Sequence, residues 1–126
     1  SIQELRGKYP SSEGHIKEIL AQSGSVIMHG IDARKLEDKF SKGSFDRIVF
    51  MFPQHPPSPK SRNKIQQHRN LLRDFLKSSA NVLKSNGKIF VTLLQGQGGT
   101  TVENNSRGYT NSWYINEAAA QAGLLI

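Results

Sequence analysis

Residues 45–53 read FDRIVFMFP, and this stretch decides the fold class. Within it, Arg47–Phe52 is almost continuously apolar and rich in residues that favour β-strands. Such a run is typical of a strand covered on both faces, as in a parallel sheet. Prolines at positions 53, 56, 57 and 59 then forbid regular structure. A buried strand that runs into a proline-rich turn, Pro53–Pro59, is therefore predicted.

Helices and strands are predicted to alternate on both sides of this strand. The upstream elements are a helix at Ser11–Gln22, a strand at Ser25–Ile31 and a short helix at Ala33–Phe40. Downstream, a long helix is predicted from Arg62 to Leu83, and Asn86-Gly87 is expected to end it. A buried strand at Lys88–Leu94 and a loop at Gln95–Tyr109 follow. The last elements are a helix at Trp113–Ala122 and the start of a strand at Leu124–Ile126. This order implies parallel strands joined by right-handed crossovers. The prediction is one α/β domain over residues 1–126.

Composition excludes several classes of protein and site. The chain has no cysteine, which removes disulfides and thiolate metal sites. Its four histidines lack the spacing of a metal centre, so no metal is expected. No apolar run approaches the roughly 20 residues that a membrane-spanning helix requires. An intracellular protein is therefore expected, and its compartment, nuclear, nucleolar or cytoplasmic, is left open.

The positive charge of the chain is concentrated in one segment. Residues 60–88 have a net charge of +7, equal to that of the whole chain. Their basic residues are Lys60, Arg62, Lys64, Arg69, Arg73, Lys77, Lys84 and Lys88, against one acid, Asp74. Most of them fall outside the apolar stripe of the long helix, which runs through Ile65, Leu72, Phe75, Leu76, Ser79, Val82 and Leu83. Either a phosphate-binding surface for RNA or a solvated helix face explains this pattern.

Ligands of parallel α/β sheets bind outside the carboxyl ends of the strands, and three polar stretches fall there. Asp32 follows the first predicted strand; it either accepts a hydrogen bond from a nucleotide-like ligand or caps the helix at Ala33. Gln54 and His55 follow the second, and histidine is the residue type best suited to moving protons near neutral pH. Gly96–Thr100 follows the third and lacks the Lys-Ser/Thr pair of a phosphate-binding P-loop, so it is interpreted as a flexible loop facing the substrate.

Several motifs, taken in order, resemble one family. Phe45–Pro53 resembles the F-D-x-I-x-F-N-F-P-H stretch of the Rossmann-like domain in the large-subunit rRNA uridine-N3 methyltransferases. That domain also forms the N-terminal part of ferredoxin-fold anticodon-binding-domain-containing proteins. Further matches are Lys8-Tyr9-Pro10, His29–Ala33, Arg69–Leu72 with Phe75, and Gln95–Thr100 with Asn111-Ser112-Trp113, the last typical of the anticodon-binding-domain branch.

The resemblance implies a class I methyltransferase fold with S-adenosylmethionine as the methyl donor and RNA, in particular rRNA, as the substrate. It places Asp32, Ala33, Phe52 and Pro53 at the cofactor. It places Gln54 and His55 where the target base meets the methyl group. The RNA-binding residues that we expect are Lys60, Arg62, Lys64, Arg69 and Gln97.

The chain departs from the family pattern in two ways. Met51 replaces the family's asparagine, and Gln54 stands where the family has histidine, which is either lost or moved one place to His55. A non-catalytic RNA-binding or scaffold module is therefore the alternative function. The family's opening strand and its glycine-rich G-E-G-x-F-S loop are absent from these 126 residues, so the predicted fold is partial and cofactor binding by this chain alone is doubtful. Three outcomes are open: the chain is an excerpt of a longer protein, a second copy completes the sheet, or the strands close into a smaller sheet.

Overall fold

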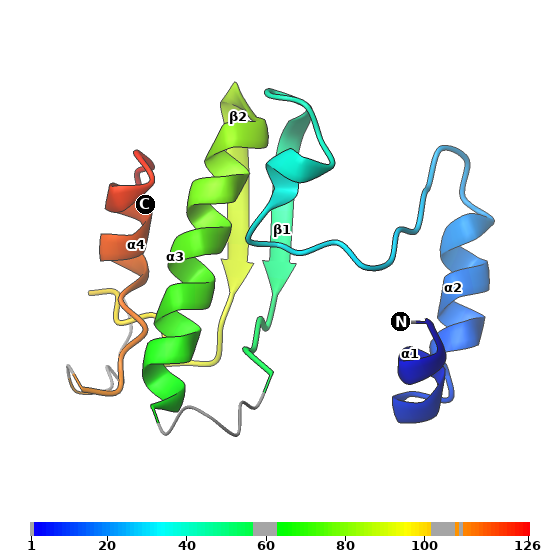
Figure 1. The fold of residues 1–126 in the computed structure, drawn as a ribbon, viewed down its shortest axis with the longest axis horizontal. Helices are drawn as coiled ribbons and strands as arrows, with labels where there is room; N and C mark the ends of the chain where they lie inside the picture. Colours follow the sequence, from blue (N-terminus) through cyan, green and yellow to red (C-terminus); the bar gives the residue numbers. More distant parts are fainter. Residues whose placement is uncertain (1, 57–62, 102–107, 109) are drawn as a thin grey trace. The chain divides into compact units, whose positions relative to one another are not determined.

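A computed structural model describes residues 2–56, 63–101, 108 and 110–126. The chain divides into two compact units, residues 1–31 and residues 32–126, and each is described by itself. The first unit contains α1 (Ile2–Lys8) and α2 (Ser12–Leu20). The second contains the 3-10 turn η1 (Leu36–Asp38), β1 (Phe45–Met51), α3 (Lys64–Val82), β2 (Leu83–Thr92) and α4 (Ile115–Gln121) (Figure 1). None of the described helices is both long and apolar enough to cross a membrane.

The strand predicted at Ser25–Ile31 does not form. These residues have no regular structure, and Val26 and Met28 are 77% and 53% exposed. A strand exists only when a neighbouring strand satisfies its backbone groups, and the two strands that the structure describes pair with each other. The prediction was wrong because an apolar run shows β-propensity but does not supply a partner.

The two strands of the second unit form a parallel sheet, as predicted. Arg47 to Met51 of β1 lie in register with Lys88 to Thr92 of β2. The structure corrects the end of the preceding helix, because α3 stops at Val82 and β2 begins directly at Leu83. Asn86-Gly87 therefore lies inside β2, where the pairing is irregular. A Cβ on Gly87 would lie 2.7 Å from the Leu83 side chain and 3.0 Å from the Asp46 carbonyl oxygen, so this crowded position favours glycine.

One face of the sheet is covered and the other is open. Ile48 and Phe50 of β1 pack, with Ile89 and Val91 of β2, against the buried residues of α3 and α4 (Figure 1). Successive side chains of a strand point to opposite faces, so Val49 and Met51 point away and are 60% and 65% exposed. The prediction that this strand is buried on both faces is therefore wrong for the second unit: a single layer of helices covers it.

The long helix α3 confirms the predicted stripe. Its buried residues are Leu72, Phe75, Leu76, Ser78, Ser79 and Val82. Asn63 caps the helix, since its side-chain oxygen accepts a hydrogen bond from the Gln66 N–H at 2.9 Å. The predicted start at Arg62 lies outside the described residues. The helix therefore presents one apolar face to the sheet and a polar, largely basic face to solvent.

Three further predicted elements, at Ala33–Phe40, Trp113–Ala122 and Leu124–Ile126, form only in part or not at all. Ala33–Phe40 is not an α-helix; it makes turns and the short η1, where the Ser78 hydroxyl accepts a hydrogen bond from the Leu36 N–H at 2.6 Å. The last helix, α4, ends where glycine was expected to stop it: Gly123 has φ +73°, and the Leu124 N–H reaches the Ala119 carbonyl at 2.9 Å. Leu124–Ile126 does not form a strand.

Candidate functional site

The turn after β1 carries the residues expected at the reaction centre. The Phe52 N–H donates to the Thr92 carbonyl at 2.9 Å, which carries the strand pairing one residue beyond β1. Phe52 has φ +48°, a left-handed conformation that costs a non-glycine residue roughly 1–2 kcal/mol. Pro53 is buried directly after it, whereas Gln54 is exposed. The backbone therefore bends sharply at Phe52, and strain of this kind is a feature of functional turns.

A pair of substitutions tests the strain at Phe52. Alanine and glycine both remove the half-exposed ring, but only glycine relaxes a positive φ. We expect Phe52→Gly to be more stable than Phe52→Ala by about 1 kcal/mol, measured by urea denaturation. Glycine is ordinarily the less stable of the two because its unfolded chain has more freedom. The usual order at this position would contradict the strained turn.

The His55 ring uses one nitrogen, Nδ1, in a hydrogen bond, which leaves Nε2 able to accept a proton. Its Nδ1 lies 2.7 Å from the Pro56 carbonyl oxygen, and a carbonyl only accepts hydrogen bonds. Nδ1 therefore carries the proton, and in the neutral ring the basic lone pair is on Nε2. The His55 backbone N–H donates to His68 Nδ1 at 3.2 Å. The turn is thus tied to β2 through Phe52 and to α3 through His55.

His68, which sequence reasoning passed over as one more helical histidine, contacts both the turn and Trp113. Its ring stacks on Trp113, with 4.3 Å between the ring centres and an angle of 8° between the planes. Burial, with the nearby His55 as the smaller cause, holds the pKa of His68 below its usual value. A signal was present in the sequence, because His68 lies four residues before Leu72 and so falls on the apolar stripe of the helix.

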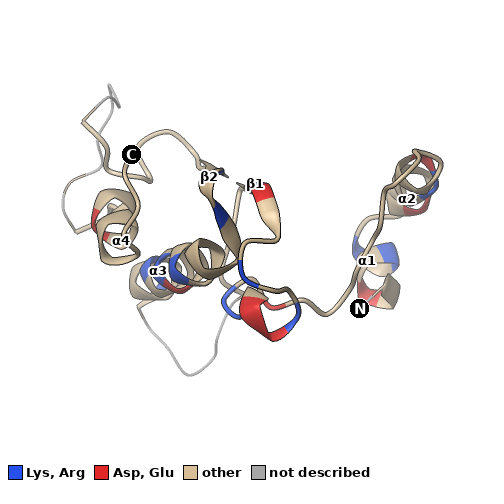
Figure 2. Cartoon of the chain, turned by 90° about the horizontal axis from the view of Figure 1, so that it is seen from above, with Lys and Arg blue, Asp and Glu red and all other residues tan. Residues whose placement is uncertain are grey.

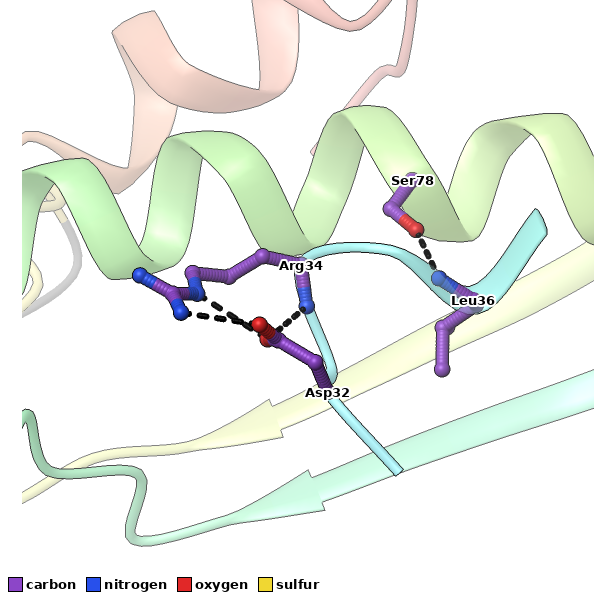
Figure 3. Close-up of polar contacts among 4 residues, drawn as sticks. All are labelled: Asp32, Arg34, Leu36 and Ser78. Carbon is purple, nitrogen blue, oxygen red and sulfur yellow. Dashed lines mark hydrogen bonds and ion pairs between the residues drawn. The ribbon is translucent and has the colours of Figure 1, made fainter. Parts of the chain in front are cut away.

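Asp32 lies before η1 and is engaged by Arg34. The Arg34 guanidinium donates to both of its carboxylate oxygens, from Nε at 2.9 Å and from Nη2 at 2.8 Å (Figure 3). The Arg34 backbone N–H adds a third bond at 3.0 Å. These bonds lower the pKa of Asp32 to about 2. Asp32 caps a turn instead of the α-helix that was expected at Ala33, and Ala33 itself packs on the core.

The loop after β2 is pinned where the sequence suggested a flexible segment. The Trp113 N–H donates to the Gln97 carbonyl at 2.7 Å, and the Ile115 N–H donates to the Gly98 carbonyl at 3.1 Å. The Gln97 side chain is 8% exposed and accepts a hydrogen bond from the Leu94 N–H. A Cβ on Gly99 would lie 2.0 Å from the Ser112 Oγ. The two halves of the motif, Gln95–Thr100 and Asn111–Trp113, therefore form one clamp at the start of α4.

Arg69 belongs to the same clamp. Its guanidinium donates to the Ser112 carbonyl at 2.9 Å and to the Thr110 carbonyl at 3.3 Å. It also lies 3.9 Å above the centre of the Tyr114 ring. These contacts order the loop, and contact of Arg69 or Gln97 with RNA stays a prediction.

Figure 2 shows Lys and Arg positions, in blue, on α3. Three basic residues of this helix, Arg69, Arg73 and Lys77, are spaced by four, and we call them the basic row. Arg73 and Lys77 are exposed, and Arg73 pairs with the neighbouring Asp74 at 2.9 Å. Lys64 is exposed in the first turn of the helix, whereas Lys60 and Arg62 lie outside the described residues. A polar cleft of about 170 Å³ lies between α3 and α4, beside Arg69 and Arg73.

Comparison with models of protein families shows which family the chain belongs to. The model described as "BMT5-like: rRNA (uridine-N3-)-methyltransferase BTM5-like" matches residues 1–126. The chain belongs to this family. The resemblance carried by Phe45–Pro53 and the motifs around it is thereby confirmed, and the chain is a member of an rRNA methyltransferase-like family.

Curated relatives are similar over most of the chain. Ferredoxin-fold anticodon-binding domain-containing protein 1 of Homo sapiens is 33% identical over 86% of the chain, and its homolog in Mus musculus is 33% identical over 85%. An uncharacterized protein of Arabidopsis thaliana is 33% identical over 73% of the chain and is matched over 46% of its own length. The chain spans 17% of the length of the two mammalian relatives. No solved structure matches it.

Proposed function

We propose that this chain is the RNA-facing part of an S-adenosylmethionine-dependent RNA methyltransferase-like domain with a Rossmann-like class I fold. The observation that carries the proposal is the turn at the carboxyl end of β1. It combines a strained backbone at Phe52, an exposed amide at Gln54 and a histidine whose Nδ1 is committed to Pro56. Family membership supplies the reaction class, rRNA uridine-N3 methylation, and the basic row supplies a surface for the phosphates.

The residues proposed for the cofactor fit it in chemistry. An ionised carboxylate has about four sites for hydrogen bonds, and Arg34 and its N–H occupy three at Asp32. Asp32, which is partly exposed, therefore retains capacity for an adenine amino group. The half-exposed Phe52 ring offers an apolar surface to the cofactor, while the buried Pro53 shapes the turn. S-adenosylmethionine supplies the methyl group when it is bound.

His55 and Gln54 act on the target base in this proposal. Uridine N3 carries a proton that must leave as the new bond to carbon forms, and His55 Nε2 is the available acceptor because Nδ1–H points at the Pro56 carbonyl. The Gln54 amide is exposed beside it and donates to a uracil carbonyl, which orients the base. Positioning of the base supplies most of the remaining acceleration.

The proposal is tested by His55→Ala in the full-length protein. We expect the methylation rate to fall roughly 100-fold or more, while donor binding by calorimetry and RNA affinity stay unchanged, because a general base acts only in the transition state. His15→Ala is the matched control, since His15 is an exposed helical histidine of the first unit. A methylation rate that His55→Ala leaves intact would remove His55 from the reaction.

A second candidate function is a non-catalytic RNA-binding module. It is favoured by Met51, an apolar residue that is 65% exposed at the end of β1, where the related enzymes place an amide. This candidate retains the basic row and predicts RNA binding without donor binding. Calorimetry with S-adenosylmethionine separates the two, because heat of binding supports the enzyme and its absence at millimolar donor supports the module.

A further inference from the structure

His68 joins three segments that are distant in the sequence. Its Nδ1 accepts the His55 N–H of the turn after β1, and its ring stacks on Trp113. Trp113 in turn donates its backbone N–H to the Gln97 carbonyl. The turn that carries the proposed reaction centre, the start of α3 and the clamp after β2 thus meet at one imidazole. Phe52 bonds to β2 at the other end of the turn, so the His68 contact fixes the end nearer to His55.

We propose that His68 is a positioning residue that holds the His55 turn in place only while its own imidazole is neutral. An imidazole nitrogen accepts a hydrogen bond through its lone pair, so His68 must be the neutral tautomer with the proton on Nε2. Protonation turns Nδ1 into a second donor that faces the His55 N–H. The hydrogen bond is then lost, and the turn separates from α3. The role of this turn as a reaction centre rests on the proposed function. The hydrogen bond between His55 and His68, and its dependence on pH, do not rest on it.

The surroundings of His68 favour the neutral form. The titratable group that faces it from the turn is His55, and the charged residues nearest to it along α3 are the cations Lys64 and Arg69. From the clamp it faces the uncharged ring of Trp113. Burial, and to a smaller degree the nearby His55, disfavour the imidazolium and lower the pKa of His68.

Because the pKa of His68 is lowered in the folded chain, the contribution of the contact to stability is greatest at high pH. At a pH above about 6.5, the pKa of His68 in the unfolded chain, His68 is neutral in both the folded and the unfolded chain, and the contact is fully formed. As pH falls below that value, the unfolded chain binds the proton first, and the contribution to stability declines until pH passes through the lower pKa of the folded state. The turn is therefore held at neutral pH and separates from α3 only when the pH falls below the lowered pKa of His68 in the folded chain.

The experiment follows the His55 amide by NMR in the wild-type chain and in two variants. His68→Phe retains an aromatic ring for Trp113 but has no acceptor. His68→Asn has an oxygen on Cγ, where the imidazole has Nδ1, and does not titrate. In the wild type we expect imidazole nitrogen shifts of the Nε2–H tautomer at neutral pH, and a His55 amide shift that changes with the titration of His68.

At neutral pH, His68→Phe is expected to speed hydrogen exchange of the His55 amide roughly fivefold, as for the loss of one ordinary hydrogen bond. His68→Asn is expected to retain most of the protection and to abolish its dependence on pH. A His55 amide that ignores the titration of His68, or a pH transition that persists in His68→Asn, would overturn the proposal. These readouts need no methyl donor, so a failure here is distinct from a failure of His55→Ala to slow methylation.

Discussion

Phe75→Ala is expected to lower the free energy of unfolding by about 3–5 kcal/mol, the range for removing a buried aromatic side chain. Phe75 is 2% exposed and lies at the contact between α3 and the sheet. Its ring centre is 4.3 Å from that of Phe50 on β1, with the planes tilted by 40°. The variant removes both buried area and an aromatic pair. Urea denaturation followed by circular dichroism measures the loss.

Phe90→Ala is the matched control for this change. Phe90 lies on β2, but its side chain is 47% exposed on the open face of the sheet. We expect a loss of about 1 kcal/mol or less, because a half-exposed ring loses far less buried area. Equal losses for the two variants would show that this face of the sheet is covered in solution.

Reversing the basic row, Arg73→Glu with Lys77→Glu, is expected to weaken RNA binding roughly 30- to 100-fold at low salt. Each position loses a charge-assisted contact with a phosphate, which is worth about 1–1.5 kcal/mol, and gains repulsion. The slope of log K against log salt is expected to become shallower by roughly 1.5, the value for two phosphate contacts. Filter binding or fluorescence anisotropy over a salt series measures both quantities. Arg69 is left unchanged, because it holds the loop at Ser112 and its loss would disturb the fold.

The control for charge is Lys39→Glu with Lys42→Glu. Both lysines are exposed and lie outside residues 60–88, and the pair changes the net charge by the same amount. If RNA recognises the basic row, this control loses only the small share of affinity that reflects overall charge. Equal losses for the two double variants would mean that RNA responds to net charge alone, and the basic row would not be a binding surface.

Elements with strong local signals were predictable from the sequence. The apolar stripe of α3 follows the helical period, and its buried residues were named except for Ser78. The strand at Arg47–Phe52 and the stop at Gly123 also depend on local chemistry, and both were found within a residue or two. The motifs of Phe45–Pro53 and its neighbours identified the family before any fold was known.

Features that depend on partners distant in the sequence were not predictable. Ser25–Ile31 has the composition of a strand and forms none, because pairing needs a neighbour that composition does not reveal. Arg69 and Gln97 looked like RNA ligands, and the tertiary structure binds them to Ser112 and Leu94. Asp32 was expected either to accept a hydrogen bond from a ligand or to cap a helix, but the turn places Arg34 on both of its oxygens.

Residues 45–53 show most clearly which features the local sequence determines and which the tertiary structure determines. Its sequence by itself predicted a strand that ends at Pro53 and a resemblance to the family, because both depend on residues close together in the chain. The later part of the predicted turn, residues 57–59, lies outside the described residues. Only the tertiary structure decided that one face of the strand is open, that Phe52 adopts a left-handed conformation and that His55 donates to His68. Burial, backbone strain and a hydrogen bond to another element are set by what the folded chain brings alongside.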